Sequence, residues 1–285
     1  MPSSGFTVGT TTYVFFWTNH CAFLDLGRNC GDRPPDIRPA PDDTNKVGTG
    51  RLTRKTGDTA FQELYSLPGN FNYTSSLNAN NIVGIPASQK LGVYVWGINH
   101  YRSSYPTLAY IPENSIGEKE AWRYFAGNLP SGAPIWSDSS SKAKPSFFSR
   151  DGDQGGCIGE FSIAWIGPME SWLMLYNCAL GGPGTIRARL AKAPWGPWSE
   201  PAEIFRPDTD SAWCRYMHAD ANYSICSDQA GGENGADHRG DPYAPFILSR
   251  FTRATAQGAE IYFLMSTWNP YQVVVMRTNL TALTH

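Results

Sequence analysis

The sequence lacks any long segment with helical periodicity and any apolar run long enough to cross a membrane. Its formal net charge is only −2, and its lysines and arginines are scattered, so it lacks the basic stripe of a nucleic-acid-binding protein. No two cysteines have the C-x-x-C spacing of a zinc knuckle. We therefore expect no nucleic-acid partner, no membrane segment, no metal and no cofactor.

Two acidic clusters also lack the spacing that cation binding requires. Asp42-Asp43 and Asp151-Gly152-Asp153 do not have the full oxygen-ligand pattern of a calcium loop. We interpret both as solvated turns.

What is abundant points to short strands joined by tight turns. The 285 residues include 28 glycines and 21 prolines, and 13% of them are aromatic. A β domain of this length is ordinary. The composition predicts an all-β protein.

One segment, Gly159–Pro201, has the pattern of a β-propeller blade. It contains three successive apolar stretches separated by Gly-Pro and Gly-rich turns, and a fourth stretch follows it: Phe161–Ile166, Trp172–Tyr176, Thr185–Ala191 and Ala202–Phe205. A four-stranded sheet of this size cannot bury both faces alone, so it requires similar sheets beside it.

Weaker copies of this pattern recur along the chain. We expect further strands at Gly5–Val8, Tyr13–Trp17, Ile82–Ile85, Leu91–Gly97, Thr107–Ile111, Ala244–Leu248, Glu260–Thr267 and Gln272–Thr278. This recurrence favours a propeller, and a β-sandwich with irregular loops is the alternative.

Cysteines and glycosylation sequons favour an oxidising compartment. The six cysteines fall into the sequence-near pairs Cys21 with Cys30, Cys157 with Cys178, and Cys214 with Cys226. Sequons begin at Asn72, Asn222 and Asn279. We expect a secreted, disulfide-bonded glycoprotein; the alternative is a cytosolic protein with reduced, buried cysteines. The N-terminus has no signal-peptide pattern, which we interpret as the loss of an N-terminal piece.

Several of these segments resemble a known family. Pro2–Phe16, Ala188–Pro201, Gly240–Leu248 and Ser266–Leu280 are similar to a family of five-bladed propellers long classed as a domain of unknown function. Some bacterial members are endo-D-arabinanases. The resemblance implies a single propeller domain over residues 1–285 that is N-terminally incomplete, with about four blades present and the first blade missing.

Two carboxylates are the candidate catalytic residues. Glycosidic cleavage requires two carboxyl groups that flank the scissile bond. Glu160 precedes the predicted strand Phe161–Ile166, and Asp241 precedes Ala244–Leu248, each beside a glycine. The alternative is that each is a strand-end carboxylate bonded to a neighbouring loop.

Polar and aromatic side chains on two predicted loops are candidate substrate contacts. They are His100, Arg102, Trp213, Arg215, His218 and Asp220. The alternative for all of them is ordinary loop packing and solvation.

The sequence thus predicts a monomeric, secreted glycoside hydrolase of the endo-D-arabinanase-like type with a polysaccharide or oligosaccharide ligand. Two alternatives stay open. One is a propeller that binds glycans without cutting them, and the other is a truncated, inactive family member, because the family's acidic residues are expected in the region before Pro2.

Overall fold

A computed structural model describes residues 2–18, 49–57, 59–99, 104–146, 157–178, 184–217, 240–268 and 272–281. Within these ranges every paired strand is antiparallel, and helical residues form short 3-10 turns. None of these turns has the length or the apolar character that a membrane span requires. The chain divides into two compact units, residues 1–82 with 86–148 and residues 83–85 with 149–285.

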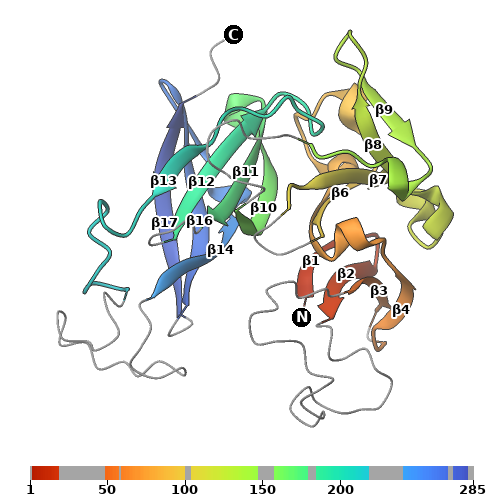
Figure 1. Cartoon of the computed structure of the whole chain (residues 1–285), viewed down its shortest axis with the longest axis horizontal. Helices are drawn as coiled ribbons and strands as arrows, with labels where there is room; N and C mark the ends of the chain where they lie inside the picture. Colours follow the sequence, from red (N-terminus) through yellow and green to blue (C-terminus); the bar gives the residue numbers. More distant parts are fainter. Residues whose placement is uncertain are drawn as a thin grey trace. The chain divides into compact units, whose positions relative to one another are not determined.

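The first unit contains two sheets in which the strands follow one another in chain order (Figure 1). The strands of the first sheet are β1 (Pro2–Val8), β2 (Thr11–Thr18), β3 (Thr49–Thr56) and β4 (Gln62–Ser66). Those of the second are β5 (Tyr73–Asn78), β6 (Val93–Ile98), β7 (Thr107–Ile111), β8 (Arg123–Asn128) and β9 (Pro134–Ser137).

The core of this unit lies between its two sheets. Phe15 and Leu52 of the first sheet share one apolar cluster with Phe71 and with Val95 of the second. Trp122 lies in the same cluster, and its ring contacts that of Phe15 edge to face at 6.3 Å. Burial of aromatic and branched side chains is what stabilises this pair of sheets.

The second unit also contains two sheets. The strands of one are β10 (Ile158–Ile166), β11 (Ser171–Cys178), β12 (Thr185–Ala191) and β13 (Ala202–Phe205). Those of the other are β14 (Asp241–Ile247), β15 (Arg253–Thr255), β16 (Gly258–Trp268) and β17 (Gln272–Thr281). β14 and β15 pair with the two halves of one edge of β16, and β17 pairs with the other edge.

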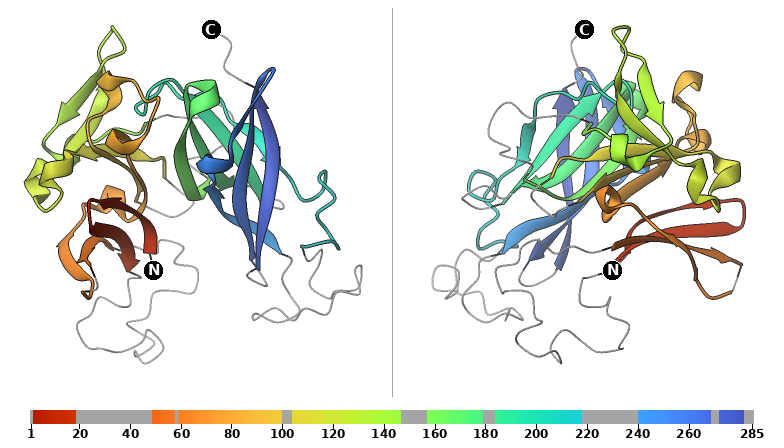
Figure 2. Two further views of the ribbon diagram at one scale, coloured as in Figure 1. Left: turned by 180° about the vertical axis from the view of Figure 1, so that it is seen from behind. Right: turned by 45° about the vertical axis from the view of Figure 1, so that its right-hand side comes forward.

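Alternation of apolar residues brings these two sheets together. Leu173 and Leu175 of β11 share a core cluster with Ile261, Phe263 and Met265 of β16, all of them buried. Because successive strand residues point to opposite faces, this pattern gives each sheet one face directed at the other. The blue sheet of β14–β17 lies against the green one of β10–β13 in both views of Figure 2.

The structure confirms the all-β prediction and the strands predicted within and after Gly159–Pro201. The strand predicted at Ile82–Ile85 is wrong, since the first strand of that sheet is β5. Val83 is 92% exposed and Gly84 has a φ of +89°, so this segment turns instead of pairing. The five-bladed ring and the single domain stay predictions.

Candidate functional site

Glu160 lies in an irregular part of β10. Ile158 pairs with Cys178 and Phe161 pairs with Tyr176, so Gly159 and Glu160 together oppose the single residue Asn177. This is a β-bulge, a device that re-aims side chains and is frequent beside functional sites. Glu160 is only 4% exposed, and β10 therefore holds a carboxyl group inside the protein.

Asn177 is the polar residue opposite the bulge. It is 1% exposed, and its Oδ1 has no hydrogen-bond partner within the described part of the chain. A Cβ on Gly159 would lie 2.6 Å from that oxygen, so only glycine leaves room for the amide. A buried acceptor of this kind requires a donor from water or from a ligand, which makes Asn177 a candidate contact.

Asp241 is the first residue of β14 and is partly buried. Its Oδ1 accepts a hydrogen bond from the backbone N–H of Gly184 at 3.2 Å. The pairing of β14 with β16 shifts between Tyr243 and Phe246, where Ala244 has a φ of +47°. β14, like β10, is therefore irregular close to its acidic residue.

The strand register places the two carboxylates at the same end of the second unit. Ile158 pairs with Cys178, and Cys178 pairs with Thr185, so these residues mark one end of the β10–β13 sheet. Glu160 lies two residues from this end. Gly184, which bonds Asp241, directly precedes Thr185. Glu160 and Asp241, which lie 81 positions apart in sequence, are therefore brought to the same end of two packed sheets.

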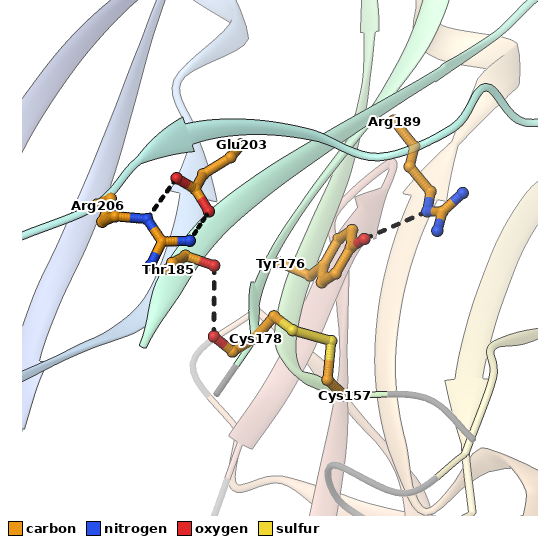
Figure 3. Close-up of a disulfide and its surroundings, with 7 residues drawn as sticks. All are labelled: Cys157, Tyr176, Cys178, Thr185, Arg189, Glu203 and Arg206. Carbon is orange, nitrogen blue, oxygen red and sulfur yellow. Dashed lines mark hydrogen bonds and ion pairs between the residues drawn. A yellow bond between two sulfur atoms is a disulfide. The ribbon is translucent and has the colours of Figure 1, made fainter. Parts of the chain in front are cut away.

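A disulfide closes this end of the sheet (Figure 3). Cys157 and Cys178 are bonded as predicted, with 4.9 Å between their Cα atoms. The Thr185 hydroxyl donates to the backbone oxygen of Cys178 at 3.4 Å. Cys214 is also disulfide-bonded. The pair Cys21 and Cys30 and the residue Cys226 lie outside the described residues.

The opposite face of the same strands carries a buried cation. Arg189 is 1% exposed, donates to the Ser199 backbone oxygen at 2.7 Å and donates to the Tyr176 hydroxyl at 3.3 Å (Figure 3). The residues on either side of it in β12, Ala188 and Leu190, belong to the core between the sheets. Arg189 therefore points away from Asn177, and its bonds give it a structural role.

Trp213 and Arg215 lie on the segment that follows β13. Gln272 donates through Nε2 to the backbone oxygen of Tyr216, which ties this segment to the start of β17 and thus to the same end of the unit as Asp241. The indole N–H of Trp213 is bonded to Asp208 at 2.7 Å, and its ring packs partly against the core. Arg215 is exposed.

Burial raises the pKa of Tyr216, and the negative charge of Asp210 adds to this shift. The Tyr216 hydroxyl on this segment therefore stays protonated and able to donate well above neutral pH.

The four other predicted contacts, His100, Arg102, His218 and Asp220, lie outside the described residues. Their roles stay predictions. Within the described ranges no three His, Cys, Asp or Glu side chains gather as a metal site would require.

The predicted sequons differ in access. Asn72 is 3% exposed, and its Nδ2 donates to the backbone and side-chain oxygens of Asn99 at 3.1 and 3.3 Å. A glycan on this amide would break both bonds, so the structure argues against Asn72 as an acceptor. Asn279 is exposed on β17, and Asn222 lies outside the described residues.

The sequence pointed to both carboxylates as candidates but not to Asn177. The signal was present, since asparagine is disfavoured in strands and stands here at the end of the apolar run Trp172–Tyr176. The bulge could not be found in the same way, because it depends on which residues pair across strands.

The fold and the end of the second unit that holds Glu160 and Asp241 define an all-β protein with a buried acidic residue, Glu160, at a β-bulge. The family described as "Domain of unknown function (DUF4185)" matches residues 45–277, and the chain belongs to this family. No curated protein matches the chain.

The solved structures that match this chain are distant. An exo-β-1,3-galactanase from Phanerochaete chrysosporium is 8% identical with a TM-score of 0.47, and the match covers 97% of this chain and 46% of the galactanase. A glycosyl hydrolase from Bacteroides ovatus is 11% identical with a TM-score of 0.46, covering 99% of this chain and 66% of that protein. The α-L-arabinofuranosidase from Podospora anserina is 12% identical with a TM-score of 0.34, covering 99% and 91%.

This chain thus spans about half the length of the galactanase. All three TM-scores lie below 0.5, too low to establish a shared fold.

Proposed function

We propose that this protein is a secreted glycoside hydrolase of the endo-D-arabinanase-like type, in which Glu160 and Asp241 supply the two carboxyl groups. The observation that carries the proposal is their placement at one end of the second unit, each beside an irregularity in the first strand of its sheet. The segments that resemble arabinanase-containing propellers support the substrate class.

The burial of the two residues suits different roles. Glu160 is buried, and an enclosed carboxyl group is the better general acid, because it can deliver a proton to the leaving glycosidic oxygen away from water. Asp241 accepts a hydrogen bond from a backbone N–H and is partly open to solvent, as suits a base or nucleophile. The unpaired Oδ1 of Asn177 would accept a hydrogen bond from a sugar hydroxyl.

The disulfide supports the proposed location. Cys157 and Cys178 form a disulfide bond, and structural disulfides persist mainly in oxidising compartments.

One observation favours a second candidate function, a propeller that binds glycans without cutting them. Asp241 already accepts a backbone hydrogen bond from Gly184, which is what a structural strand-end carboxylate does. If Asp241 only holds that loop, the edge retains polar groups for binding but lacks a second catalytic acid.

Release of reducing ends from arabinan, galactan and xylan distinguishes the two functions. We expect hydrolysis of arabinan by the wild type and a loss of about 10²- to 10⁴-fold in kcat for both Glu160→Gln and Asp241→Asn, with thermal midpoints nearly unchanged. Glu170→Gln is the matched control, since Glu170 is exposed and follows the far end of β10. Binding of a polysaccharide without hydrolysis would instead support the second function.

A further inference from the structure

The first unit contains a pocket that the carboxylates of the second unit do not explain. It has a volume of about 600 Å³, within the range of small-molecule sites. It lies where the link after β4 meets the turn before β8 and the turn after β9. Its lining includes Leu67, Pro68, Lys119, Glu120, Tyr124 and Asp138.

Tyr124 is the most informative side chain of this pocket. It is 5% exposed, and its hydroxyl makes no hydrogen bond to any described residue. Burial raises the pKa of this hydroxyl to about 12, so it stays a donor under physiological conditions. The hydroxyl oxygen is not one of the fully buried atoms that lack a partner, so it reaches the solvent of the pocket and can donate to a ligand there.

The floor below Tyr124 is rigid. Its ring stacks on Trp122 at 6.1 Å, and the Trp122 indole N–H donates to the Tyr65 hydroxyl at 2.9 Å. The Tyr65 hydroxyl in turn donates to the backbone oxygen of Ile116 at 2.7 Å. This network fixes the position of Tyr124 before any ligand arrives, which lowers the entropic cost of binding.

Charged groups of both signs surround the entrance. Lys119 and Glu120 belong to the 3-10 turn η7 (Lys119–Ala121), and Asp138 follows β9. Among the described residues none of the three side-chain charges takes part in an ion pair or a side-chain hydrogen bond. An anion would be repelled by two carboxylates, and a simple cation would meet the lysine.

We propose that this pocket binds a neutral, polyhydroxylated ligand, a short saccharide. A sugar hydroxyl both donates and accepts, so it can donate to Glu120 and Asp138 and accept from Lys119 and Tyr124. Leu67 and Pro68 offer apolar contact for the C–H face of the ring. This inference does not rest on the proposed hydrolysis, because it uses no residue of the β10–β14 edge.

Titration of the full chain with arabinotriose, β-1,3-galactotriose and cellotriose, followed by calorimetry, tests the proposal. We expect at least one trisaccharide to bind, and we expect Tyr124→Phe and Asp138→Asn each to weaken its binding by about fivefold, the value of one hydrogen bond. Tyr124→Phe keeps the ring contacts with Trp122, so the fold should persist. Glu118→Gln is the matched control, because Glu118 is exposed, precedes η7 and does not line the pocket.

Glu160→Gln separates this pocket from the proposed catalytic edge, because it should lower hydrolysis while leaving the binding of the trisaccharide to this pocket unchanged. The proposal is overturned if none of the three trisaccharides binds, if the Tyr124 and Asp138 variants bind as tightly as the wild type, or if inorganic phosphate competes with the sugar.

Discussion

Gly159 occupies a position in β10 where any side chain would meet Asn177. The Cβ of Gly159→Ala would lie 2.6 Å from the Asn177 Oδ1, and the amide would have to move. We expect a loss of about 1–3 kcal/mol in the free energy of unfolding, as for other overpacked positions. Urea denaturation measures this loss, and hydrolysis should fall as well, because Glu160 shares the bulge.

Gly167→Ala is the control for this change. A Cβ there would meet nothing within 4 Å, so its free energy of unfolding should stay within about 0.5 kcal/mol of the wild type. If both substitutions lowered the free energy of unfolding equally, the close approach of position 159 to Asn177 could not be the cause of the loss.

Two tyrosines of the first unit predict alkaline sensitivity. Burial raises the pKa of Tyr65 and of Tyr124 to about 12, whereas an unfolded tyrosine titrates near 10. Their stabilisation is fully present below about pH 10 and is lost as the pH rises toward 12, because the unfolded state releases these protons first.

Urea denaturation at pH 8, 10 and 11 measures this loss. The double variant Tyr65→Phe/Tyr124→Phe should lose less stability across that range than the wild type. A parallel decline in both proteins would contradict burial as the cause.

The sequence predicted Glu160 and Asp241 from their places before apolar strands and beside glycines. It could not predict that Tyr124 and Asp138 line one pocket, because that depends on how two turns and a strand meet.

The disulfide Cys157–Cys178 joins the start of β10 to the end of β11. It was predictable because the two cysteines stand at the two ends of one hairpin, with 21 residues of separation. For a loop of this length, removal by Cys157→Ala/Cys178→Ala should cost about 3 kcal/mol of unfolding free energy. Thermal denaturation of the double variant checks the value.

Hydrogen exchange locates the effect of the same double variant. Amides of β10 and β11 should exchange faster, while those of β5–β9 should keep their rates. Faster exchange confined to the first unit would contradict the local role assigned to this bond.

Strands with apolar or aromatic runs were found, and polar strands were not. β3 has the sequence TGRLTRKT and β4 has QELYS, so neither shows the uniform apolar character that predicts a buried strand. Leu52 of β3 is nevertheless fully buried, and pairing with β2 forms this strand despite its charged residues. Pairing of this kind is a tertiary effect that local composition does not record.

At the scale of the whole molecule, each compact unit has its own apolar core between two antiparallel sheets. The all-β class was predictable because it follows from composition and turn residues. The division into two compact units was not, since the short segment 83–85 belongs with residues 149–285 despite lying far from them in sequence.

The proposed hydrolysis depends most on whether Glu160 and Asp241 form one two-carboxylate site. The most direct measurement is the distance between the side-chain Cδ atom at position 160 and the Asp241 carboxyl carbon in a crystal structure of Glu160→Gln with a bound arabinan oligosaccharide. We predict a separation of about 5–10 Å with a glycosidic oxygen between the two groups. A larger separation, or a sugar bound away from both residues, would contradict the account.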